Sequence, residues 1–73
     1  MNNTGSVLLV EDDANIQRIN RRILEREGFY VYCAACLQEA YEILNEHTPD
    51  VLVLDIMLPD GSGLAFCEKI DRK

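Results

Sequence analysis

The sequence lacks a long apolar run: no uninterrupted apolar stretch approaches the roughly 18 residues that cross a bilayer. Its N-terminus also lacks the basic segment followed by an apolar segment that marks a secretion signal. These absences predict a cytoplasmic location and no membrane partner. Basic residues are scarce too, with 7 Lys and Arg against 13 Asp and Glu. Since phosphate contacts need clustered Lys and Arg, this segment is not expected to contact nucleic acid.

Cysteine occurs three times, but the patterns that would give it a function are missing. An odd count in a chain without an export signal disfavours a disulfide framework. Cys33 and Cys36 have C-x-x-C spacing, yet a zinc site needs about four ligands. Cys67 and His47 are the remaining candidates and do not form a second close pair. We therefore expect thiols that fill gaps in the core, with a metal or redox function as the less favoured alternative.

The 73 residues allow one small domain, in which strands and helices alternate. Apolar and β-branched runs predict strands at residues 7–10, 29–33 and 51–54. Helical spacing of apolar residues predicts helices from 14 to 27, from 37 to about 46 and from 64 to about 72. Asp13 fits the N-cap of the first helix and Gly28 the position just past its C-terminus, while Ser62 fits a cap of the third.

This alternation implies a parallel sheet joined by right-handed helical crossovers. The first and third predicted strands are apolar at every position, so both are expected in the interior of the sheet. The second is mixed and suits an edge. The strand order 2-1-3 meets these preferences, and the predicted fold class is α/β, a flavodoxin-like doubly wound parallel sheet.

Acidic residues directly follow the first and third predicted strands. Glu11 and Asp12 follow one, and Asp55 follows the other. Neighbouring strands lie roughly 4.8 Å apart, and parallel strands end at the same edge, so the three carboxylates are expected to converge where open α/β sheets bind ligands. Clustered carboxylates repel, and Mg²⁺ is the cation that all-oxygen ligation suits. An aspartate beside Mg²⁺ can attack a phosphoryl group to give an aspartyl-phosphate.

The stretches "VLLVEDD" and "VLVLDIMLPDGSG", with the helix between them, resemble the receiver domain of two-component response regulators. The resemblance covers essentially the whole chain after residue 5. It rests on two strands that end in acids at this separation, with Pro59 and Gly63 following the second.

The resemblance assigns a role to four positions. It implies that Asp55 accepts a phosphoryl group from a sensor histidine kinase or a phosphotransfer protein, and that the chain then acts as a conformational switch on an effector. It implies Mg²⁺ held by Glu11, Asp12, Asp55 and the backbone carbonyl of Met57. A domain of this kind modifies itself, so we do not expect a turnover enzyme.

The sequence also departs from the family's pattern. A receiver domain has five strands and five helices, and the match ends inside the third helix. The hydroxyl residue after strand four and the lysine after strand five have no counterpart here. We therefore expect a flexible tail at 1–5 and the N-terminal portion of a receiver domain at 6–73. An open edge of the third strand would invite association with another copy, by pairing or domain swapping.

Other functions fit less well. Phosphatases of the haloacid dehalogenase type and topoisomerase-primase metal sites need an Asp-x-Asp pair, but Met57 stands at the second position. The sequence around Gly61 fails as an EF-hand, because apolar residues and Cys67 fall at ligand positions. The stronger alternative is a receiver-like interaction module, or a truncated fragment, that binds a partner without being phosphorylated.

Several other polar residues have structural interpretations. Asp60 is predicted to shape the turn rather than bind metal, and Asp13 to cap a helix. His47 is expected at a surface helix end. Arg18, Arg21 and Arg22 form a basic arc, for which a solvated face is favoured and kinase docking is the alternative.

Overall fold

The computed structural model describes residues 5–55 and 57–71, and all the predicted strands and helices are present. The elements are β1 (Ser6–Val10), α1 (Ala14–Arg26), β2 (Tyr30–Ala34), α2 (Leu37–Glu46), β3 (Val51–Leu54), β4 (Met57–Leu58), β5 (Gly61–Ser62) and α3 (Gly63–Asp71). Strand β2 lies one residue later than predicted. The β4–β5 hairpin was not predicted, because a loop was expected there. The predicted helix end at Arg72 lies outside the described residues.

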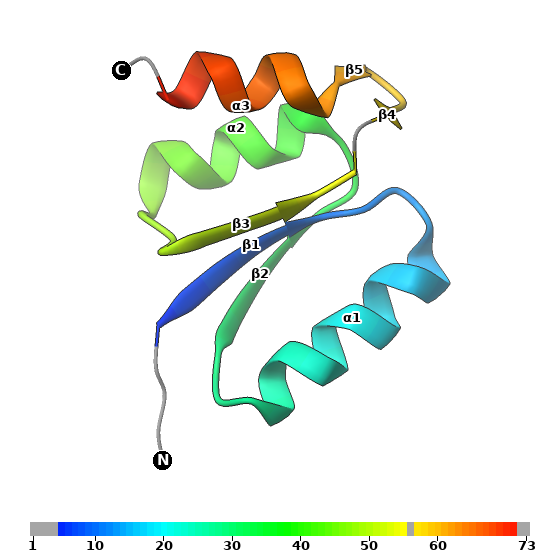
Figure 1. Cartoon of the computed structure of the whole chain (residues 1–73), viewed down its shortest axis with the longest axis vertical. Helices are drawn as coiled ribbons and strands as arrows, with labels where there is room; N and C mark the ends of the chain where they lie inside the picture. The colour runs from blue at the N-terminus through cyan, green and yellow to red at the C-terminus, as the bar shows by residue number, and fades with distance from the viewer. Residues whose placement is uncertain (1–4, 56, 72–73) are drawn as a thin grey trace.

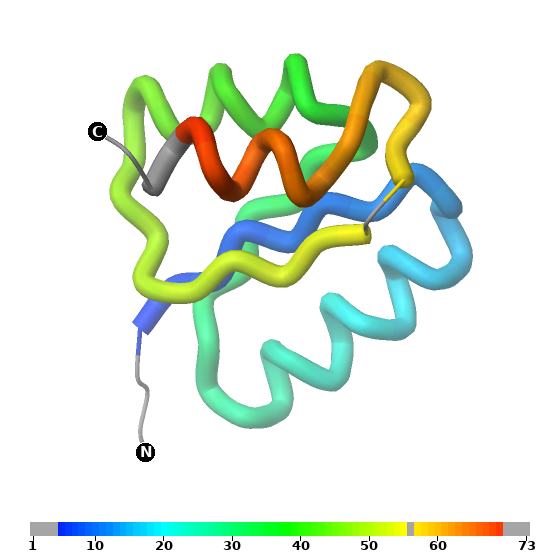
Figure 2. Tube along the Cα trace, turned by 45° about the horizontal axis from the view of Figure 1, so that its top comes forward, coloured from blue at the N-terminus to red at the C-terminus, as the bar shows by residue number. Residues whose placement is uncertain are grey.

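Strands β2, β1 and β3 form a parallel sheet in that order, which confirms the predicted 2-1-3 topology and the flavodoxin-like fold class. Helix α1 lies on one face of the sheet, and α2 and α3 lie together on the other (Figure 1). The second view shows the same arrangement, with α2 and α3 side by side over β3 (Figure 2). The three layers leave the carboxyl ends of β1 and β3 next to each other.

The core lies between the sheet and the layer of α2 and α3. Strand β1 occupies the centre of the sheet, and its four apolar residues Val7–Val10 are at most 1% exposed. Side chains alternate across a strand, so Leu8 and Val10 enter one cluster. Its other members are Ala34, Leu37, Ala40, Leu58 and Phe66. Burying a Leu or Phe side chain contributes about 1.5–3 kcal/mol, and this cluster therefore holds α2, α3 and the β4–β5 hairpin against the sheet.

Both predicted ends of α1 are confirmed. The Asp13 side chain accepts hydrogen bonds from the backbone N–H of Asn15 and of Ile16, at 2.9 and 3.0 Å. At the other end Gly28 has a φ of +96°, and its N–H donates to the Glu25 carbonyl. The N–H of Phe29 donates to the Leu24 carbonyl, which completes a Schellman motif. These caps set where the chain leaves β1 and where it enters β2.

On the face of the sheet beneath α1, the edge formed by β3 is less completely covered than the centre. The prediction of an interior position holds for β1, whereas β3 pairs on one side only within the described residues. Its Val51 and Val53 side chains are 45% and 39% exposed. The α1 isoleucines Ile16, Ile19 and Ile23 are also exposed. Association through this open edge stays a prediction.

None of the described helices is long and apolar enough to cross a bilayer.

Candidate metal and phosphoacceptor site

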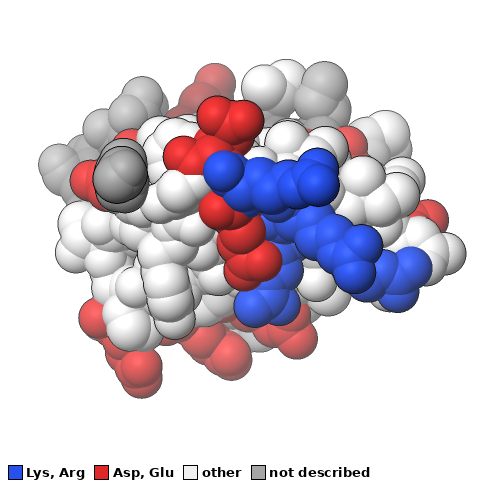
Figure 3. Space-filling model, turned by 90° about the horizontal axis from the view of Figure 1, so that it is seen from below, with Lys and Arg blue, Asp and Glu red and all other residues white. Residues whose placement is uncertain are grey.

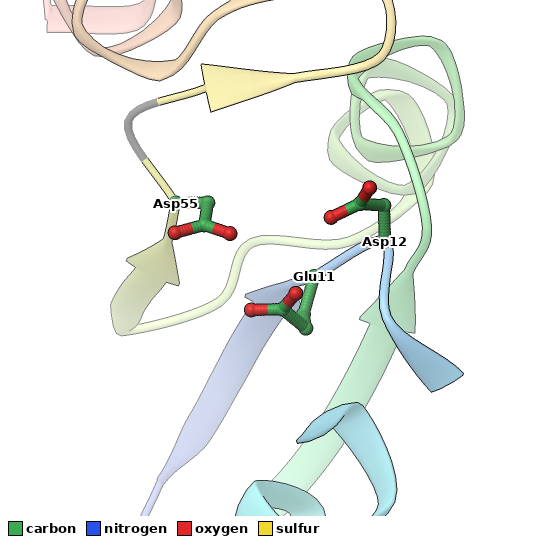
Figure 4. Close-up of side chains that lie close together, drawn as sticks. All are labelled: Glu11, Asp12 and Asp55. Carbon is green, nitrogen blue, oxygen red and sulfur yellow. The ribbon is translucent and has the colours of Figure 1, made fainter. Parts of the chain in front are cut away.

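The carboxylates of Glu11, Asp12 and Asp55 meet at the carboxyl ends of β1 and β3. Val10 and Leu54 are register partners in the parallel pair, so the residues that follow them leave the sheet at the same place. The three side chains face a common space (Figure 4). One ligand oxygen of each lies within 4.8 Å of the others, with Glu11 half-buried and the two aspartates exposed. The structure thus brings together three residues that the sequence separates by up to 44 positions.

Backbone contacts hold Glu11 in place. Its N–H donates to the Ala34 carbonyl at 3.0 Å, which extends the β1–β2 ladder by one step. The Gln17 side-chain amide donates to the carbonyls of Glu11 and Ala34, at 3.1 and 3.2 Å. Gln17 therefore joins the ends of β1 and β2 from the first turn of α1. The sequence pattern did not single out Gln17, because one of its two partners lies 17 residues away in the chain.

The pKa of Glu11 reflects one backbone hydrogen bond, the burial of its carboxylate and the charges of two neighbouring aspartates. The N–H of Asp13 donates to the Glu11 carboxylate at 3.1 Å. This hydrogen bond favours the charged carboxylate and acts to lower the pKa of Glu11. Burial, together with the charges of Asp55 and Asp12, outweighs that bond, so the pKa of Glu11 is raised above its ordinary value of 4.5. A cation bound in this pocket would lower the pKa of Glu11, because it would stabilise the charged carboxylate.

The donor set suits a hard divalent cation. Mg²⁺ binds oxygen ligands at about 2.1 Å, so ligands on opposite sides of the ion lie about 4.2 Å apart. That distance is the largest possible between two ligands of one ion, and the three carboxylate oxygens, all within 4.8 Å of one another, come close to it. The exposure of Asp12 and Asp55 leaves room for the waters that Mg²⁺ retains. The residues present therefore fit the ion.

Met57 and Asp60 lie in the segment that follows Asp55. Met57 begins β4, and its side chain is 80% exposed. The contact between its carbonyl and a metal stays a prediction. The Asp60 carboxylate accepts hydrogen bonds from the N–H groups of Leu37 and Gln38, at 2.8 and 3.0 Å. These two bonds lower the pKa of Asp60 below 3.8. Asp60 thus lies outside the cluster, as expected, but it caps another helix rather than only shaping its own turn.

The cysteines and His47 take no part in this cluster. Cys33, Cys36 and Cys67 are free thiols, and within residues 5–55 and 57–71 the acidic trio is the one group arranged to hold a metal ion. His47 follows the end of α2, and its ring stacks on Tyr32 with centroids 4.6 Å apart. The surface interpretation of His47 is confirmed.

The basic arc lies on the exposed side of α1. Figure 3 views the molecule from the side that α1 covers and shows Lys and Arg side chains gathered there, next to acidic ones. Arg18, Arg21 and Arg22 are all exposed, and Arg21 forms an ion pair with Glu25 at 3.0 Å. The arc is therefore a solvent-facing charged surface, separate from the carboxylate cluster.

A doubly wound parallel sheet with its acids at the topological switch point defines a class of domains that bind ligands at that edge. Residues 7–73 match the family model of the response regulator receiver domain, and the chain belongs to this family. Membership places it in two-component signal transduction.

Solved structures agree with this assignment. The non-phosphorylated HemR receiver domain from Leptospira biflexa has 34% sequence identity and a TM-score of 0.87, over 96% of this chain and 56% of that one. A two-component response regulator of the LuxR family from Aurantimonas sp. SI85-9A1 has 35% identity and a TM-score of 0.85, over 96% and 51%. The Francisella response regulator 1452 receiver domain has 26% identity and a TM-score of 0.87, over 94% and 57%. The chain thus spans 51–57% of the length of these three chains.

Proposed function

We propose that Asp55 accepts a phosphoryl group from a histidine kinase or a phosphotransfer protein, in a pocket that Glu11 and Asp12 complete with Mg²⁺. The observation that carries this proposal is the 4.8 Å convergence of the three carboxylates at the ends of β1 and β3. Receiver domains as a class bind Mg²⁺ in an acidic pocket and interact with histidine kinases and effector domains.

The chemistry assigned to this chain is a single displacement at phosphorus. A carboxylate oxygen of Asp55 forms a bond to phosphorus while the bond between phosphorus and the donor's imidazole nitrogen breaks. The electron pair of the broken bond stays on the imidazole. Bound Mg²⁺ would offset charge on the phosphoryl and carboxylate oxygens. Glu11 and Asp12 hold the ion, and the exposure of Asp55 leaves its oxygen open to the donor.

Two further assignments belong to this proposal. The chain changes itself rather than releasing a product repeatedly, so we class it as a phosphoacceptor and not as a turnover enzyme. A cytoplasmic location fits a domain whose donor is a kinase. The alternative, an interaction module that binds a partner without phosphorylation, differs from the proposal in one measurable respect, which is the covalent adduct.

The decisive experiment treats the full-length protein with acetyl phosphate and Mg²⁺ and measures its intact mass. We expect one added phosphoryl group, stable in acid and removed by base. Asp55→Asn should abolish the adduct, and omitting Mg²⁺ should strongly reduce it.

Asp13→Asn is the matched control, because it removes a charge beside the site while asparagine still caps α1. It should retain the adduct. An adduct that persists in Asp55→Asn refutes the assigned acceptor. Mg²⁺ binding without any adduct in the wild type would favour the interaction module.

A further inference from the structure

The first turn of α2 takes its cap from a distant part of the chain. A helix leaves its first N–H groups without partners in the helix. Cys36 occupies the N-cap position and forms no side-chain cap bond. The Asp60 carboxylate supplies the acceptors, with Oδ1 2.8 Å from the Leu37 nitrogen and Oδ2 3.0 Å from the Gln38 nitrogen. Both oxygens are thus used, one for each N–H group.

Asp60 belongs to the segment that begins at the phosphoacceptor. It lies five residues after Asp55, in the turn between β4 and β5. Leu58 anchors this segment from the other side, since it is only 9% exposed and lies in the core cluster. Gly61 approaches α2 so closely that a Cβ there would lie 3.0 Å from Leu37 Cδ1, and its φ is +152°. The segment is therefore held at α2 as well as at the sheet.

We infer that Asp60 is a positioning residue that couples the metal and phosphoryl site to the start of α2, through its two hydrogen bonds to the Leu37 and Gln38 N–H groups. This inference rests on the proposed function and deepens it. The bonds fix Asp60 against α2, and Met57, the predicted carbonyl ligand, lies three residues earlier in the same segment. Coupling free energies are reciprocal, so if the Asp60 hydrogen bonds strengthen Mg²⁺ binding at Asp55, bound Mg²⁺ stabilises those bonds by the same free energy.

Glu39 offers a control within the same turn. Its Oε1 accepts a hydrogen bond from the N–H of Ala35 at 2.7 Å. Glu39 therefore also holds the start of α2, but it belongs to α2 itself and lies outside the segment that follows Asp55. Losing either carboxylate weakens this turn, but only the loss of Asp60 removes hydrogen bonds that join the segment after Asp55 to α2.

The experiment measures Mg²⁺ affinity by calorimetry and amide resonances by NMR in the full-length protein. Positioning residues around metal ligands typically change affinity by 10–100-fold, and for this exposed carboxylate we expect the low end, about tenfold weaker binding in Asp60→Ala. Asp60→Asn should weaken binding by less than Asp60→Ala does, because its single amide oxygen can keep one of the two hydrogen bonds. Glu39→Ala should bind within about twofold. In the wild type, Mg²⁺ should shift the Leu37 and Gln38 amides more than the Ala35 amide.

The outcomes separate this inference from the function on which it rests. Equal losses of affinity in Asp60→Ala and Glu39→Ala would reduce Asp60 to a stabilising cap and overturn the inference. If Mg²⁺ does not shift the Leu37 and Gln38 amide resonances of the wild type, that result alone overturns the inference, without any variant. Both results leave the acetyl phosphate adduct at Asp55 intact, whereas a wild type without Mg²⁺ binding at Asp55 overturns the proposed function as well.

Discussion

The two ends of the parallel sheet carry acids in opposite circumstances. At the amino ends of β1 and β3, Asp50 accepts hydrogen bonds from the Ser6 N–H at 2.8 Å and from the Ser6 hydroxyl at 3.4 Å. The Asp50 N–H donates in return to the Ser6 carbonyl at 2.9 Å. At the carboxyl ends three carboxylates face one another, and a single backbone N–H donates to Glu11. At one end the chain's own donors satisfy the acid, whereas at the other end the negative charge is not neutralised by any Lys or Arg among the described residues.

This difference shows how to tell a structural acid from a ligand. Within residues 5–55 and 57–71, the ion pair formed is Arg21–Glu25 on α1, away from both sheet ends. The three acids at the carboxyl end are therefore not paired with a described Lys or Arg. Removing Asp50 should cost stability, whereas removing the repulsion among the three acids should add it. Three measurements test this contrast, in order of expected size.

The largest effect is stabilisation by Mg²⁺. A ligand that binds the native state stabilises it by about 2.7 kcal/mol at 100 times its Kd. For a domain of this size that free energy raises Tm by roughly 10 °C or more. Thermal unfolding followed by circular dichroism, with and without MgCl₂ at matched ionic strength, measures it. Asp55→Asn should lose most of the shift, and equal stabilisation of that variant would place the ion elsewhere.

Loss of the Asp50 contact is the next largest effect. Asp50→Ala removes the acceptor of two Ser6 bonds, which should lower the free energy of unfolding by about 1 kcal/mol. Denaturant titration measures the change. Asp50→Asn should lose less, since its amide oxygen still accepts. Mg²⁺ affinity should stay within about twofold in both variants, and a larger change would contradict the separation of the two sheet ends.

The smallest effect is a pH dependence at Glu11. Its pKa is raised above 4.5 in the folded chain, so its contribution to stability is full below pH 4.5 and is lost as the pH rises through the raised pKa. Glu11→Gln should remove that decline and raise Tm by a few degrees near neutral pH without metal. Asp60 has the opposite sign, because its pKa lies below 3.8 and its contribution is lost as the pH falls. Tm measured from about pH 3 to pH 7 separates the two, and a Glu11→Gln curve parallel to the wild type contradicts the assignment.

Local patterns in the amino-acid sequence predicted much of this fold. The four-residue apolar runs of β1 and β3 marked strands because parallel strands are buried on both faces. Asp13 and Gly28 marked the ends of α1, because caps depend on residues a few positions away. The β4–β5 hairpin was not foreseen, since its two-residue strands carry too short a pattern. The roles of Gln17 and Asp60 depend on partners 17 to 23 residues distant, which no local pattern reveals.

The order of strands and helices, the burial of β1 and the placing of acids after two strands could all be read from the amino-acid sequence, because each depends on side chains close together in the chain. Tertiary structure decided that Glu11, Asp12 and Asp55 lie within 4.8 Å, and that Asp60 reaches α2 while Asp50 reaches Ser6. The physical reason is the parallel register, which sets Val10 beside Leu54 and so brings together carboxylates that belong to different crossovers. Charge repulsion and hydrogen bonding act through space, and their effects appear only when the sheet has formed.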